Sequence, residues 1–130
     1  MMEVKKMALS EEAVKLHGEG LNCAQCVLMA SGKYTGLDPE TAKRIAGGFG
    51  GGVRSGEICG AISGAVMALG LLEEEKAKLA GAARQCVDAY RASYGCVRCL
   101  DLKRAGVSCD ELIAYSAEYV ENYRLKKEKD

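Results

Sequence analysis

The chain has 130 residues and a mass of 13.8 kDa, which is enough for one domain with a single buried core. Its 18 basic residues balance 18 acidic ones, which excludes a function that depends on bulk charge attraction to nucleic acid or to an anionic membrane. Seven residues are cysteine, and an odd number cannot pair completely within one chain. This cysteine density is below that of disulfide-stapled secreted miniproteins.

The arrangement of apolar residues predicts a cytoplasmic protein. Charged residues interrupt the first thirty positions, so we expect no secretion signal. The longest nearly uncharged apolar run, residues 61–72, is too short to cross a bilayer as a helix and is expected to be a buried core helix. In a reducing cytosol, a metal, a cluster or redox chemistry explains seven cysteines better than structural disulfides do.

Helix start signals occur early in the chain. Ser10 is expected to cap a first helix that runs to about residue 18, and Asn22 to cap a second one that runs to about residue 34. Asp38 followed by Pro39 predicts a third start, because proline is tolerated at the first helical position.

The third helix is expected to end in the glycine-rich run 47–52, which is too flexible to continue it. A loop should follow to about residue 58. The next residues, 59–69, fit a buried helix in which the small residues Gly60 and Gly64 let another backbone approach closely.

Two more helices are expected towards the C-terminus. Residues 73–94 are amphipathic, and a turn at Gly95 should stop that helix. Ser108 begins a capping box that predicts a last helix to about residue 123, followed by a charged, frayed tail over 124–130. We find no alternating strand pattern. The sequence therefore predicts an all-α fold with one domain over 1–130, a core from about residue 8 to 124, and a compact bundle of five or six helices with a Gly-rich loop.

Three cysteines fall where helices are predicted to begin. Cys23 follows the Asn22 cap, Cys59 opens the small-residue helix, and Cys109 follows the Ser108 cap. The unpaired N–H groups and the positive dipole of a helix N-terminus favour thiolate over thiol, so we expect a lowered pKa at these positions. Thiolates bind metals and also attack disulfides, so this argument leaves both chemistries open.

The other cysteines give weaker signals. Cys23 with Cys26 and Cys96 with Cys99 have C-x-x-C spacing, but 69 residues separate the two pairs, whereas zinc modules keep theirs about 15–20 residues apart. Cys86 lies on the apolar stripe of the 73–94 helix and is expected to pack in the core. The tyrosines are likewise expected to be core and interface rings, and the single histidine, His17, to be a surface residue.

Several segments taken together resemble the C_GCAxxG_C_C family of redox-active proteins, over residues 11–120. They are Asn22-Cys23-Ala24-Gln25, the glycine-rich run, Cys59-Gly60-Ala61-Ile62-Ser63-Gly64, and two later cysteines. The resemblance implies four characteristic cysteines, which correspond to Cys23, Cys59, Cys99 and Cys109. A similar module accompanies the haem domain of split-Soret cytochrome c, where it is associated with an iron–sulfur centre, although this chain has no C-x-x-C-H haem attachment signal.

We therefore expect an iron–sulfur cluster, [2Fe–2S], on these four thiolates, in an electron-transfer component or redox sensor. Gly50, Gly51, Gly52 and Gly60 are expected to let the backbone approach the cofactor and donate N–H groups to it. Thiol–disulfide chemistry and a zinc-stabilised interaction module stay open as alternatives. The expected partner is a redox protein of unknown identity rather than nucleic acid or a membrane, and tyrosines on an apolar helical surface are compatible with a homodimer.

Overall fold

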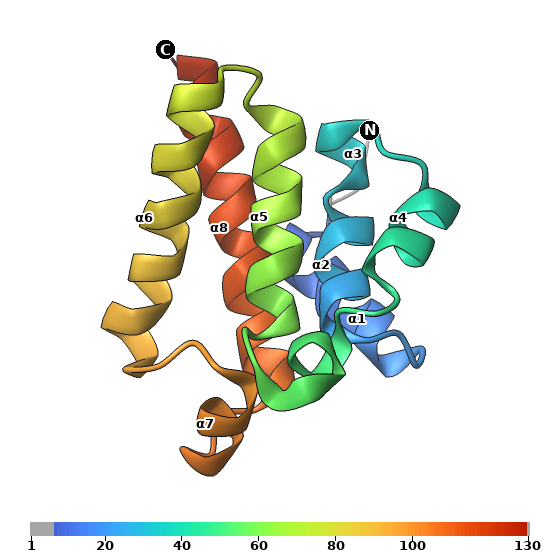
Figure 1. The fold of residues 1–130 in the computed structure, drawn as a ribbon. Helices are drawn as coiled ribbons and strands as arrows, with labels where there is room; N and C mark the ends of the chain where they lie inside the picture. Colours follow the sequence, from blue (N-terminus) through green and yellow to red (C-terminus); the bar gives the residue numbers. More distant parts are fainter. Residues whose placement is uncertain (1–6, 130) are drawn as a thin grey trace.

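The structure is a computed structural model that describes residues 7–129, and it is built from helices joined by short turns (Figure 1). The elements are α1 (Leu9–Gly18), α2 (Cys23–Ala30), α3 (Gly32–Thr35), α4 (Pro39–Ala46), the π-helical turn η1 (Gly52–Gly56), α5 (Gly60–Leu72), α6 (Lys76–Tyr94), α7 (Cys99–Arg104) and α8 (Cys109–Lys129). Over the described residues there is no strand, only an isolated bridge between Ile58 and Arg98. Six helices have eight residues or more, which confirms the predicted all-α bundle.

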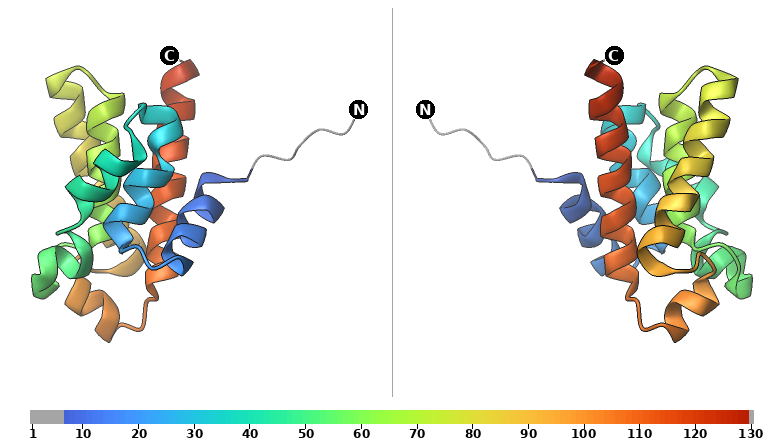
Figure 2. Two further views of the ribbon diagram at one scale, coloured as in Figure 1. Left: turned by 90° about the vertical axis from the view of Figure 1, so that its right-hand side faces the viewer. Right: turned by 90° about the vertical axis from the view of Figure 1, so that its left-hand side faces the viewer.

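Three helices run in the same direction and begin at the same end of the molecule. In Figure 1, α2, α5 and α8 all start at the lower end and run upwards, whereas α6 runs downwards beside α5. α2 and α8 pack against α5, α1 packs against α8, and α4 packs against α2. The two views of Figure 2 show that η1 and α7 lie together at the lower end, where they close the bundle.

Small residues bring α5 and α2 into close contact. A Cβ placed on Gly64 would lie 2.8 Å from the carbonyl oxygen of Ala24 and 3.1 Å from the Cβ of Val27. The close backbone approach that the sequence predicts for this helix is therefore present, between α5 and α2. The faces of α5 that meet its neighbours are filled by buried alanine, isoleucine and leucine.

The predicted caps at Asn22 and Ser108 are confirmed, and Asp38 caps α4 at the predicted third start. Each side-chain oxygen accepts a hydrogen bond from the backbone N–H three residues later, at 2.8, 2.9 and 3.1 Å respectively. Gly95 ends α6 with φ 80°, as the predicted turn requires.

Two predicted boundaries near the N-terminus are wrong. The first helix is capped at Ala8 rather than Ser10, and the Ala8 N–H donates to a carboxylate oxygen of Glu11 at 3.2 Å. The second helix stops at Ala30, and α3 follows as a separate turn. Ser31 lies at this break, where its hydroxyl donates to the carbonyl of Val27 at 2.7 Å, a local bond of the kind that bends helices.

The C-terminal part also differs from the prediction. α6 begins at Lys76 rather than at residue 73, because Glu73 has extended backbone angles. The buried Glu73 carboxylate binds Lys127 at 2.9 Å and the Tyr123 hydroxyl at 2.8 Å. Lys127 belongs to the tail that we expected to fray, and this tail is helical to Lys129.

Of the tyrosines of α6 and α8, Tyr90 belongs to the predicted core, and the other four are partly buried and pack against it. Tyr90 is fully buried and its hydroxyl is hydrogen-bonded to Ser116. The Tyr115 ring packs edge-on against those of Tyr90 and Tyr94, with centroids 4.8 and 5.4 Å apart. Within the described part of the chain, no helix is both long enough and apolar enough to cross a membrane.

Candidate functional site

A cavity of about 170 Å³ opens at the lower end of the bundle, and all four cysteines singled out from the sequence line it. Cys23 comes from α2, Cys59 directly precedes α5, Cys99 opens α7 and Cys109 opens α8. The remaining lining residues are His17, Asn22, Gly51, Leu102, Lys103, Val107 and Leu112. A single water needs about 10–15 Å³ of such volume, so the cavity has room for a much larger occupant.

All four cysteines lie at helix beginnings. The sequence predicts this for three of them, and for Cys99 it predicts only a turn after the preceding helix. α7 was not expected, because it is short and its N-cap residue, Arg98, makes no side-chain capping bond. The parallel direction of α2, α5 and α8 is what brings three of these beginnings to one end of the molecule (Figure 1).

Gly60 determines how closely Cys23 approaches α5. A Cβ on Gly60 would lie 2.5 Å from the Cys23 Sγ and 2.7 Å from the carbonyl oxygen of Phe49, both shorter than real Cβ contacts. Any side chain at this position would therefore push α2 or the glycine-rich segment away. Gly60 contributes to the site by leaving space for the Cys23 thiol beside Cys59.

The other three glycines predicted at the site have different surroundings. Gly51 has φ 64° and lines the cavity. A Cβ on Gly50 would lie 2.7 Å from the side chain of Asn22, and one on Gly52, where φ is 66°, would lie 2.4 Å from the backbone of Glu57. Gly50 and Gly52 thus allow the segment to fold closely against its neighbours, and only Gly51 faces the cavity.

Asn22 joins the start of α2 to the glycine-rich segment. Its Oδ1 caps α2, while its Nδ2 donates to the carbonyl oxygens of Gly47, at 3.1 Å, and Ala46, at 3.4 Å. It also lines the cavity beside Cys23. The cap follows from the sequence pattern, whereas this second role does not, because the contact joins residues more than twenty positions apart.

Cys59 and Cys99 are held next to each other by backbone hydrogen bonds. The Cys59 N–H donates to the carbonyl of Val97 at 2.9 Å, and the Cys99 N–H donates to the carbonyl of Glu57 at 2.6 Å. The Glu57 carboxylate in turn binds Arg98 at 3.0 Å. These bonds form the isolated bridge between Ile58 and Arg98 and fix one wall of the cavity.

The pKa values expected from the helix beginnings are not found at Cys59 and Cys109. Burial raises the pKa of the Cys59 thiol to about 11, although the backbone N–H groups of Ile62 and Ala61 favour the thiolate. Burial also raises the pKa of Cys109, and the neighbouring Cys23 adds to the rise while Lys103 opposes it. Desolvation therefore outweighs the helix ends at both thiols and favours their protonated form.

The remaining three cysteines do not line the cavity. Cys86 is fully buried in the core, which confirms the packing interpretation. Cys26 is also fully buried, and its thiol donates to the carbonyl of Leu21 at 3.6 Å. Burial raises the pKa of both thiols to about 12. Cys96 is half-buried at the edge of the core.

His17 lies at the surface, as expected, but it also takes part in the site. It lines the cavity at the end of α1, with about a third of its side chain exposed, and its Nδ1 lies 2.6 Å from Oδ1 of Asp110. Asp110 directly follows Cys109, so the pair joins α1 to the start of α8. No local pattern around His17 indicates this contact, because it depends on how α1 packs against α8.

The thiols surround the cavity rather than one point. Over residues 7–129, no group of three or more His, Cys, Asp or Glu side chains is arranged so that it could hold a metal ion. The site is thus a space walled by four thiols that are not gathered around a single point.

The fold and the site together define a small all-α protein whose distant cysteines converge on one cavity. One family profile, described as "Putative redox-active protein (C_GCAxxG_C_C)", matches residues 21–123. The chain belongs to this redox-active family, as the sequence motifs predict. Neither the curated proteins nor the solved structures include a match to the chain.

Proposed function

We propose that this protein holds an iron–sulfur cluster, [2Fe–2S], on Cys23, Cys59, Cys99 and Cys109 and acts in electron transfer or redox sensing. One observation carries the proposal: four segments far apart in the sequence each bring one thiol to the same cavity. Bound there, such a cluster supplies reversible one-electron chemistry.

The chemistry and the size of the cavity both favour this occupant. Four soft sulfur ligands select iron–sulfur clusters or zinc over hard cations. A structural zinc ion needs its four sulfurs at about 2.3 Å from one point. Thiols spread around about 170 Å³ instead suit an occupant with several metal atoms. A cationic occupant also offsets the cost of ionising buried thiols such as Cys59.

The residues around the thiols have definite tasks in this proposal. The N–H groups of Ala61 and Ile62 donate towards the Cys59 sulfur, and such bonds tune the potential of a cluster. Gly60 leaves room for the Cys23 sulfur, and Asn22 fixes the backbone from which it projects. Leu102, Val107 and Leu112 form the apolar part of the wall and limit the access of water.

Anaerobic purification with iron and sulfide analysis tests the proposal. We expect a coloured protein with iron and acid-labile sulfide, and loss of most of the iron in each of the variants C23A, C59A, C99A and C109A. The matched control is C86A, which removes a buried thiol outside the cavity and should keep its iron. A protein that stays colourless and iron-free after reconstitution would overturn the proposal, as would equal loss of iron in C86A.

The same convergence supports thiol–disulfide chemistry as a second candidate, because Gly60 places the Cys23 thiol against the start of α5, next to Cys59. Two thiols would lose two protons and two electrons to form one disulfide, and a peroxide would accept the electrons. Mass spectrometry after mild oxidation should then find a reversible loss of two protons localised to one cavity pair. Stoichiometric zinc without iron would instead favour a zinc-stabilised interaction module.

A further inference from the structure

Three large apolar side chains remain exposed around the cavity wall. Val53 in η1 is 50% exposed, Ile58 is 39% exposed, and Leu100 in α7 is 41% exposed. η1 packs against α7, and a Cβ on Gly56 would lie 3.3 Å from the Cβ of Leu100. The segments 52–58 and 97–104 therefore form one continuous surface, which we call the η1–α7 surface.

This surface is one wall of the cysteine cavity. Its two segments are joined by the hydrogen bonds from Cys59 to Val97 and from Cys99 to Glu57. Both of these cysteines line the cavity on the inner side of the wall. A protein that covers the outer side would therefore come close to two of the four thiols.

The backbone at Val53 adds an independent observation. Val53 has φ 59° and ψ 38°, and Arg54 has φ 59° and ψ 16°, a left-handed conformation that glycine or asparagine adopts more easily. A β-branched residue is especially disfavoured there. Since half of the Val53 side chain is exposed, packing within the chain does not explain a valine at this position. Strained residues of this kind cluster at functional sites.

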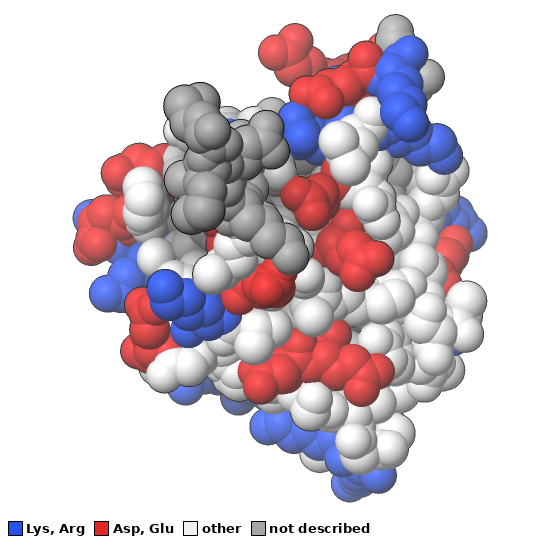
Figure 3. Space-filling model, turned by 180° about the vertical axis from the view of Figure 1, so that it is seen from behind, with Lys and Arg blue, Asp and Glu red and all other residues white. Residues whose placement is uncertain are grey.

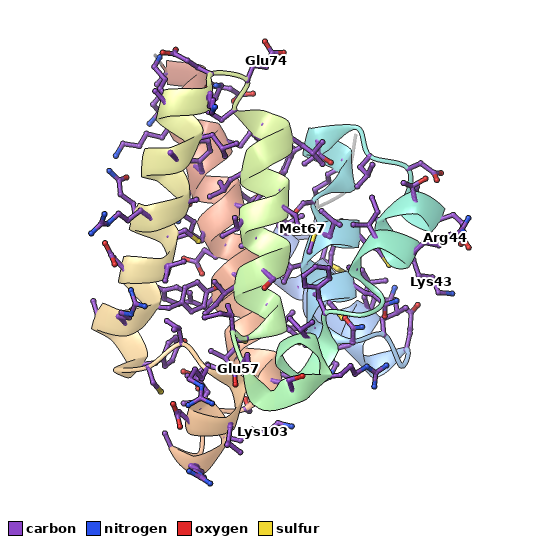
Figure 4. The ribbon with its side chains drawn as sticks, viewed as in Figure 1. Lys43, Arg44, Glu57, Met67, Glu74 and Lys103 are labelled. Carbon is purple, nitrogen blue, oxygen red and sulfur yellow. The ribbon has the colours of Figure 1, made fainter. Side chains whose placement is uncertain are left out.

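The charges of the η1–α7 surface are unbalanced. Segments 52–58 and 97–104 carry four basic residues and two acidic ones, and both acidic side chains, Glu57 and Asp101, pair with Arg98. Arg54, Lys103 and Arg104 are exposed and have no ion pair with any described residue. Figure 4 shows Lys103 at the lower end, below Glu57, and Figure 3 shows Lys and Arg side chains at the lower tip of the molecule.

We propose that the η1–α7 surface is the docking site for an acidic one-electron carrier protein. The apolar centre of the partner's surface would cover Val53, Ile58 and Leu100, and its acidic rim would face the unpaired basic side chains. The identity of the partner as an electron carrier rests on the proposed function. If the proposed cluster is bound behind the wall, one electron would pass from the reduced carrier to the oxidised cluster, and no bond would form or break.

The charges also disfavour a second copy of this chain as the partner bound at the η1–α7 surface. A two-fold interface would bring the same patch of each copy together. The unpaired basic residues would then face one another, which is unfavourable. An acidic partner places opposite charges at the same positions.

Two sets of variants separate docking from folding. V53N removes the apolar side chain and inserts a residue that tolerates the left-handed conformation, so its thermal stability should not fall. The double variant R54E/R104E reverses charge on the surface but outside the residues that line the cavity. Its matched control is K126E/K129E, which reverses two exposed lysines of α8 at the opposite end of the molecule.

Binding is measured first, on the metal-free protein in reducing buffer. The probe is an acidic flavodoxin, with a basic c-type cytochrome as the opposite-charge probe. At low ionic strength we expect flavodoxin to bind more tightly than the cytochrome and to shift amide signals of residues 52–58 and 97–104. Its Kd should rise at least tenfold in V53N and in R54E/R104E, and less than twofold in K126E/K129E.

Electron transfer is measured next, on the loaded protein by stopped flow. The rate constant with reduced flavodoxin should fall at least tenfold in the two surface variants, while dithionite reduces all variants equally. The docking proposal is overturned if both probes bind with the same affinity or if the surface variants bind flavodoxin as tightly as the wild type does. It is also overturned if the wild-type protein self-associates and V53N abolishes that self-association. If no cluster forms but binding follows the expected pattern, the proposed function fails and the docking surface stands.

Discussion

The contact between Gly60 and Cys23 predicts that the single substitution Gly60→Ala will damage the site and the fold together. The new Cβ would have to move about 0.9 Å from the Cys23 Sγ to reach the 3.4 Å of an ordinary contact, and about 0.7 Å from the Phe49 carbonyl oxygen. Because Gly60 is the first residue of α5, these shifts would separate the beginnings of α5 and α2.

The size of the effect follows from two opposing contributions. Overpacking of this kind costs about 1–3 kcal/mol. Replacing glycine by alanine in a helix returns up to about 1 kcal/mol. We therefore expect a net loss of about 1–2 kcal/mol, which for a domain of this size lowers the Tm by roughly 4–8 °C.

Thermal unfolding of the metal-free, reduced protein, followed by circular dichroism, measures this loss without any contribution from a cofactor. The matched control is Gly81→Ala in α6, where the new Cβ would meet nothing within 4 Å. That variant should gain about 0.4–1 kcal/mol. The same substitution thus has opposite signs at the two positions. A Gly60→Ala protein that is as stable as the wild type would refute the steric argument.

Two further predictions concern the contacts that hold the helices in place. The hydrogen bonds from Lys127 and Tyr123 lower the pKa of Glu73 to about 2, so Glu73 stabilises the fold above its unfolded pKa and loses this effect as the pH falls towards 2. In thermal melts E73Q should therefore be less stable than the wild type at pH 7. This difference in stability should shrink between about pH 5 and pH 2. The control E74Q, at an exposed position, should match the wild type throughout. N22A should lose about 1–2 kcal/mol in urea unfolding, as should the matched cap variant D38A. Only N22A should alter the alkylation rate of Cys23 measured by mass spectrometry, and equal rates in both variants would contradict the role given to Asn22.

The features that could be predicted from the sequence are those set by near neighbours. The caps at Asn22, Asp38 and Ser108 each join a side chain to a backbone group three residues away, so a short pattern is enough to find them. The end of α6 at Gly95 is equally local. The presence of the long helices and most of their beginnings follow from such local patterns, which is why the all-α fold was predicted correctly.

The features that were missed depend on how distant segments pack. Glu73 holds the end of α8 through Lys127, more than fifty residues away, and the sequence shows only a charged tail there. His17 reaches the cavity because α1 packs against α8, and no pattern around it indicates this. The pKa of Cys59 also depends on packing between distant segments. Its position at a helix beginning was predicted correctly, but the burial that raises its pKa was not.

The glycines show how packing and chemistry are linked in this site. A Cβ on Gly60, one of the glycines predicted at the cofactor site, would have the Cys23 sulfur as its closest neighbour. Gly64, one helical turn later, meets the backbone of Ala24, the residue after Cys23. Gly60 and Gly64 therefore allow one close contact between α5 and α2. This contact places Cys23 next to Cys59. The segment places two thiols at once, one through its own cysteine and one through the space that its glycines leave for α2.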